Sequence, residues 1–243
     1  AALRNENGLV DPDKVSAAVF ASVNDALDAV REDSIHQIDL RNVEFELPDT
    51  GPVKRVSVSS ATVAQTGAGR MQFSYDADVD GRRATLNATA TRDATARRIA
   101  SLDADLEIEG AGNYGEGSST EVGPAADGAR LGSIALKLSG SEASGDSPSR
   151  LAVSLSLTGS VLDLDERDLL PVDADATATL VAGSNKISVD RLLIKNGRSS
   201  FDFAGSIGPK PAVAGEEPAY RYDLTSDGST LAPSESPEPA LQF

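Results

Sequence analysis

The feature that most constrains the fold of this chain is an alternation of apolar and polar residues with a period of two, which begins near residue 38 and recurs almost to the end. Residues 71–79, 102–108 and 174–180 follow this pattern without a break. Because successive side chains of a β-strand point to opposite faces, each segment has one apolar and one wet face, which is typical of antiparallel sheets. Helical connections between the segments are missing, so a parallel α/β fold is excluded.

Turn signals divide the alternating region into roughly ten to twelve strands. The strongest is Asp80 followed by Gly81, a pair that suits a two-residue hairpin turn. Asn196 and Gly197 mark another turn near the end of the region. The parity of the alternation changes around Arg41, which predicts a β-bulge in the first strand. The next strand, which carries Val56, Val58, Ala61 and Val63, shows a similar slip.

A single helix precedes the strands, and the sequence places it at residues 12–31. Asp11 is suited to cap it, Pro12 suits the first helical position, and Asp13 favours the positive end of the helix dipole. Its polar positions are not dominated by Lys and Arg, so we expect packing on the sheet rather than on a membrane surface. The apolar residues at helical spacing are Val15, Val19, Phe20, Val23, Leu27 and Val30.

These patterns predict a mostly β fold of antiparallel strands that carries one N-terminal amphipathic helix; an extended, curved sheet, a β-groove or half-pipe, is the form implied by a family resemblance that three segments of the chain carry. A β-sandwich is the alternative, because alternation alone does not say whether two apolar faces close on each other. We expect residues 1–34 to form the helical segment and residues 35–243 the β domain, with a mobile loop near residues 110–129. Aromatic residues make up only 4% of the chain, so the core should be thin and spread along many strands.

Charge and composition exclude several functions. The net charge of −16 argues against nucleic-acid binding, since phosphates need Lys and Arg partners. The chain has no cysteine, and its one histidine, His36, is read as a surface residue, so we expect no enzyme activity, catalytic residue, cofactor or metal site. A run of carboxylates could bind calcium, but it lacks the spacing of an EF-hand loop, so we expect no calcium site there. These carboxylates are Asp163, Asp165, Glu166, Asp168, Asp173 and Asp175.

The chain shows no signal peptide and no stretch of about 18 apolar residues that would span a membrane. It stops after a Pro/Ser/Glu-rich stretch, in what resembles the start of another strand. We therefore expect a piece of a longer protein, with any membrane contact made only through segments outside this chain.

Three segments resemble the AsmA-like family of Gram-negative envelope proteins, which includes bridge-like lipid-transfer proteins. They are GSVLDL at residues 159–164 followed by Leu169 and Leu170, the hairpin IKNGRSSFDFAGSI at residues 194–207, and LAPSESP at residues 231–237. The resemblance implies a periplasmic module, tethered to the inner membrane in the full-length protein. Its apolar groove would shelter or transfer lipid acyl chains between the inner and outer membranes.

Lipid or another apolar ligand is thus the expected partner. The alternative is a structural or adaptor domain that binds a protein partner at an open sheet edge. The residues predicted to line a lipid groove are Val56, Val58, Phe73, Tyr75, Leu86, Leu106, Leu136, Leu155, Ile187, Val189, Phe201 and Phe203.

Overall fold

The computed structural model describes residues 3, 9–32, 37–46, 55–67, 69–93, 95, 97–110, 129–130, 132–163, 169–210, 219–226 and 228–231. Most of the loop predicted at residues 110–129 lies outside these residues, as do His36, three of the clustered carboxylates and the last twelve residues.

The first element is helix α1 (Pro12–Glu32), which agrees with the prediction. The carboxylate of Asp11 accepts a hydrogen bond from the backbone N–H of Asp13 at 3.0 Å. The carbonyl of Asp11 accepts the N–H of Val15, also at 3.0 Å. Asp11 therefore caps the helix, and Pro12 occupies the position where a missing N–H costs nothing.

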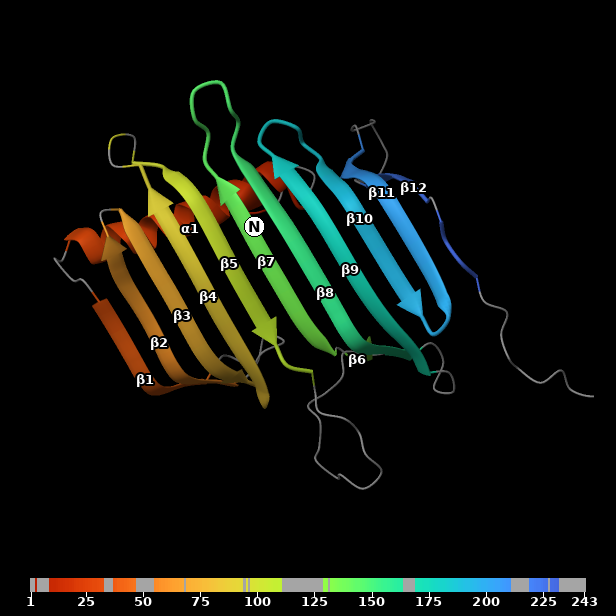
Figure 1. Ribbon diagram of the computed structural model, residues 1–243, viewed down its shortest axis with the longest axis horizontal. Coiled ribbons are helices and arrows are strands. Elements are labelled where there is room, and N and C mark those ends of the chain that lie inside the picture. Colours follow the sequence, from red (N-terminus) through yellow and green to blue (C-terminus); the bar gives the residue numbers. More distant parts are fainter. Residues whose placement is uncertain are drawn as a thin grey trace, which may run out of the picture.

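The described strands form one antiparallel sheet in which neighbours in sequence are neighbours in space (Figure 1). The exception is the short β6, which pairs with β8. Within the described chain β1 and β12 each pair with one neighbour only, so the sheet is open and forms no second layer. The predicted extended, curved sheet is confirmed, and the sandwich alternative does not apply. The strands are β1 (Gln37–Glu46), β2 (Arg55–Gly67), β3 (Arg70–Val79), β4 (Arg82–Arg92), β5 (Ile99–Ile108), β6 (Ala129–Arg130), β7 (Ser133–Ser141), β8 (Arg150–Asp163), β9 (Leu169–Val181), β10 (Ile187–Asn196), β11 (Ser199–Pro209) and β12 (Tyr220–Thr225).

The predicted changes of parity in β1 and β2 are present and lie side by side, but β1 keeps one register with β2, so the β-bulge predicted in β1 is absent from this pairing. The pairing of β2 with β3 shifts between Val58 and Ser60. In β1, Asn42 has a positive φ of 53°, and the residues on either side of it keep one register with β2. Both strands therefore deviate at the same level, which keeps their apolar residues on one face despite the change of parity. At the β3–β4 turn, Asp80 and Gly81 have φ of 51° and 81°, as a type I′ hairpin requires.

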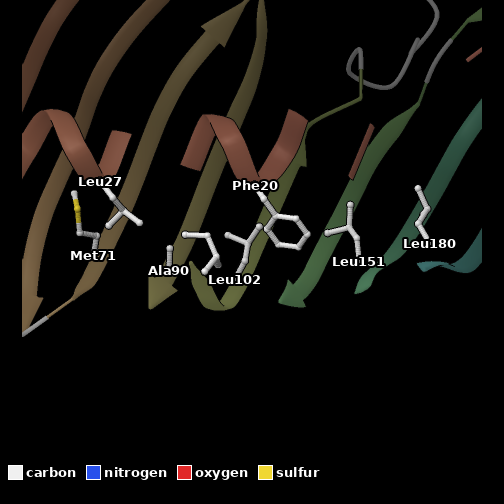
Figure 2. Packing of buried hydrophobic residues seen from close by; sticks show 8 residues of the cluster. Phe20, Leu27, Met71, Ala90, Leu102, Leu151 and Leu180 are labelled. Atoms are coloured by element: carbon white, nitrogen blue, oxygen red, sulfur yellow. The ribbon is translucent and has the colours of Figure 1, made fainter. Parts of the chain in front are cut away.

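The core lies between α1 and one end of the sheet. The helix crosses the strands near the ends that carry the β4–β5 and β9–β10 turns (Figure 1). Figure 2 shows Phe20 and Leu27 of the helix above side chains from several strands. The buried cluster consists of Phe20, Leu27, Met71, Ala90, Ile99, Leu102, Leu151 and Leu180.

Polar contacts hold both ends of the helix on the sheet. At its start, both carboxylate oxygens of Asp13 accept the N–H of Gly183, each at 3.1 Å, in the β9–β10 turn. Towards its end, Asp28 accepts a hydrogen bond of 2.6 Å from Arg92 at the end of β4. The Arg92 side chain is only 10% exposed, so this ion pair is shielded from water on one side.

A third contact holds the middle of the helix. One carboxylate oxygen of Glu142 accepts the side-chain amide of Asn24 at 3.0 Å and the backbone N–H of Ile99 at 2.5 Å. Glu142 follows β7, so it joins the helix to the start of β5 and to the end of β7. The three contacts fix the helix across one end of the sheet, and no other described helix covers the rest of the same face.

Candidate apolar binding face

The register of the sheet arranges the apolar side chains in rows that run across the strands. Directly paired residues share a face, so each row can be followed from strand to strand. We call the first complete row beyond the helix-covered zone the middle row, and the next one, farther from the helix, the distal row. The middle row is Leu40, Ala61, Tyr75, Leu86, Leu106, Leu136, Leu155, Ala176, Leu192 and Phe203. The distal row is Val43, Val58, Ala77, Ala84, Ile108, Ile134, Leu157, Ala174, Ile194 and Phe201.

The middle row is unbroken from β1 to β11 and remains in contact with solvent. None of its side chains is fully buried, and Leu40 and Leu155 are 46% and 39% exposed. At about 4.8 Å per strand the row is roughly 40 Å long. In the distal row Val58, Ala77 and Ala84 are buried, whereas Ala174 and the larger Ile134 and Leu157 keep partial exposure. A continuous apolar strip that stays in contact with solvent is the kind of surface that marks binding sites on monomeric proteins.

All twelve residues predicted to line a groove lie on this face. Six belong to the middle row, and Val58 and Phe201 belong to the distal row. Val56 pairs with Val79 beyond the distal row. Phe73 and Ile187 instead pack against the helix-covered core, and Val189 is buried. The six in the middle row are Tyr75, Leu86, Leu106, Leu136, Leu155 and Phe203.

Sequence reasoning missed several members of the same rows. Leu40, Ile134 and Leu157 stand in the alternating segments with the parity of the named residues, so consistent use of parity would have found them. Leu192 was harder to place, because the register of β10 shifts between Val189 and the following residues.

The opposite face of the sheet is wet, and several of its charged side chains form ion pairs. Arg83 contacts Asp76 at 2.8 Å and Arg191 contacts Asp202 at 2.8 Å. The hydrogen bond from Arg83 holds the pKa of the Asp76 carboxyl below its ordinary value. The described part of the carboxylate run fits this surface, since Asp175 accepts a hydrogen bond from a neighbouring serine on the wet face. No group of three potential metal-ligating side chains comes together among the described residues.

The guanidinium of Arg82, at the end of the apolar face that lies away from the helix, is engaged by backbone carbonyls. Arg82, at the start of β4, donates to the carbonyl of Glu109 at 2.7 Å and to that of Gly132 at 2.5 Å. These bonds tie the ends of β4, β5 and β7 together. The guanidinium therefore has a structural role at the border of the face.

Comparisons with family models, with curated proteins and with solved structures find no match for this chain. In the part of the chain that the structure describes, no helix is long and apolar enough to cross a membrane. The functional argument therefore depends on the apolar face.

Proposed function

We propose that this chain is a non-enzymatic module of the bacterial envelope that shelters or transfers lipid acyl chains on its uncovered apolar face. The observation that carries the proposal is the unbroken middle row, which stays in contact with solvent beyond the edge of the helix. Apolar surface kept in water costs about 25 cal/mol per Å². The free energy gained when an acyl chain binds therefore increases with the length of the strip that the chain covers.

The chemistry of the strip suits an acyl chain. The two rows consist of aliphatic and aromatic side chains, with one hydroxyl at Tyr75. A hydrocarbon chain needs no hydrogen-bond partners, so it loses nothing on leaving water for such a surface. The partly exposed alanines of β9 and β4 lower the surface between larger neighbours and offer space for a thin, extended acyl chain. They are Ala88, Ala174, Ala176 and Ala178.

The cellular setting of the proposal comes from the sequence resemblance to AsmA-like proteins. In this setting, the module lies in the periplasm and is tethered to the inner membrane through segments outside this chain. It carries lipid towards the outer membrane. The wet, acidic face would keep the module soluble between the two membranes.

An adaptor role is the second candidate, and the edge of β1 favours it. Gln37–Glu46 pairs with β2 on one side only. Ile38 and Leu40 on this strand are 37% and 46% exposed, because no further strand covers them within the described chain. A protein partner that adds a strand here would satisfy the free backbone groups and bury both side chains.

Native mass spectrometry of the purified chain, after incubation with phospholipid vesicles, tests the proposal. We expect wild-type protein to carry lipid and Leu155→Glu to carry at least about tenfold less, because a charge in the middle row must be desolvated under an acyl chain. The matched control is Ser154→Glu, one residue earlier on the opposite face, paired with Lys137. Lipid-free wild-type protein, or equal binding by both variants, would refute the proposal.

A further inference from the structure

Tyr75 differs from every other residue of the middle and distal rows. It carries the only polar side-chain atom in these two rows. It lies on β3, paired with Ala61 on one side and Leu86 on the other. A hydroxyl placed within an otherwise hydrocarbon strip has no obvious part in forming the sheet.

The surroundings of Tyr75 leave its hydroxyl available. Its neighbours Ala77 on the same strand and Ala84 and Ala88 on β4 are small; Ala77 and Ala84 are themselves buried, whereas Ala88 is partly exposed. The side chain is half-buried, and its hydroxyl makes no hydrogen bond within the described part of the chain. Partial burial raises the pKa of the Tyr75 hydroxyl, so the group stays neutral and can donate a hydrogen bond to an acceptor.

The charges around the strip decide which acceptor fits. Neither row contains Lys or Arg. The two arginines at the ends of β4 are engaged, Arg82 with backbone carbonyls and Arg92 with Asp28. The chain as a whole carries a net charge of −16. A phosphate would find no counter-charge beside Tyr75, whereas an uncharged carbonyl oxygen needs only the single donor that is present.

We propose, building on the function argued above, that the Tyr75 hydroxyl donates a hydrogen bond to an ester carbonyl of the bound lipid. The contact would fix the glycerol end of the lipid at β3 and let an acyl chain run along the middle row toward β11. Ester-linked lipids are then preferred over ether-linked lipids of the same length, and the headgroup stays in water.

A competition experiment on the full chain isolates this carbonyl. Vesicles contain equal amounts of dipalmitoyl phosphatidylcholine and its dihexadecyl ether analogue, which have the same phosphate and nearly the same chains. Native mass spectrometry reports the ratio of the two lipids on the protein. We expect wild type to favour the ester lipid by roughly two- to tenfold, the factor of one neutral hydrogen bond. Tyr75→Phe should bring the ratio close to one without changing the amount of ether lipid bound.

The control is Tyr222→Phe, which removes a hydroxyl from a tyrosine that is 65% exposed at the other end of the sheet and should leave the ratio unchanged. A wild-type ratio near one overturns the role of Tyr75 and leaves the lipid function standing. An equal loss of both lipids in Tyr75→Phe also overturns it, because the hydroxyl would then contact a group that both lipids share, such as the phosphate. Absence of both lipids from wild type overturns the lipid function itself.

Discussion

Two leucines on one strand provide the sharpest test of whether the middle row is uncovered. Leu151 and Leu155 both lie on β8 and on the same face of the sheet. Leu151 is 1% exposed in the cluster beneath the helix, whereas Leu155 is 39% exposed in the middle row. The perturbation is the same in both cases, Leu to Ala, so residue type and strand are matched and the cover above the side chain is the variable.

The expected costs follow from burial. Leu151→Ala loses the full transfer free energy and leaves a cavity under α1, which costs about 2–5 kcal/mol. Leu155→Ala removes a side chain that water already reaches and leaves no closed cavity. With full burial of a leucine worth about 1.5–3 kcal/mol, its loss should be about 1 kcal/mol. The two variants should therefore differ by about 2 kcal/mol.

Urea denaturation followed by far-ultraviolet circular dichroism measures this difference, because the chain has no tryptophan for a fluorescence readout. With a slope of about 2–3 kcal/mol per M, Leu151→Ala should lower the midpoint by about 1 M or more and Leu155→Ala by less than about 0.5 M. Equal losses above about 2 kcal/mol would mean that Leu155 is covered as thoroughly as Leu151. The apolar face would then be an ordinary core, and both proposals above would fail.

Other contacts give further predictions. Asp28→Asn should destabilise the chain by about 1–3 kcal/mol in the same urea assay, because Arg92 loses its carboxylate in a shielded site; a change below about 0.3 kcal/mol would contradict the helix anchor. Gly205→Ala should cost more than about 1 kcal/mol and speed amide exchange in β12, since its φ is +148° and a Cβ would meet a β12 carbonyl; unchanged exchange would contradict this close approach. Titration by NMR should find the pKa of Asp76 below its ordinary value, and Arg83→Met should raise it. The folded state is therefore favoured by this pair above the ordinary carboxyl pKa, and the gain is lost as the pH falls through the lowered one.

Much of the fold follows from local sequence signals. The helix bounds depend on Asp11 and Pro12, and the β3–β4 hairpin depends on Asp80 and Gly81. In each case neighbouring residues decide the conformation, so a reading of the chain finds it. The assignment of side chains to the apolar face follows from parity in the same way, once the irregularity near Asn42 is allowed for.

The position of the helix and the open face were not available from local signals. Alternation looks the same in an open sheet and in a sandwich, because both have one apolar face per strand. The helix is fixed by pairs far apart in sequence, such as Asp13 with Gly183 and Asp28 with Arg92. Each of these residues is ordinary on a polar surface, so only the fold reveals that they meet. The separation of covered from uncovered rows depends on these pairs.

A sheet with an uncovered apolar strip can still be stable, and the topology explains how. Every long strand pairs with the next long strand in sequence, so the backbone hydrogen bonds form with little loop-closure cost. Within the middle row each side chain also shields its neighbours on the adjacent strands, which is why most of the row is half-buried without a second layer. The helix supplies a closed core at one end only. The fold therefore keeps its stability in the ladder and the helix-covered rows, and leaves the middle row in contact with solvent.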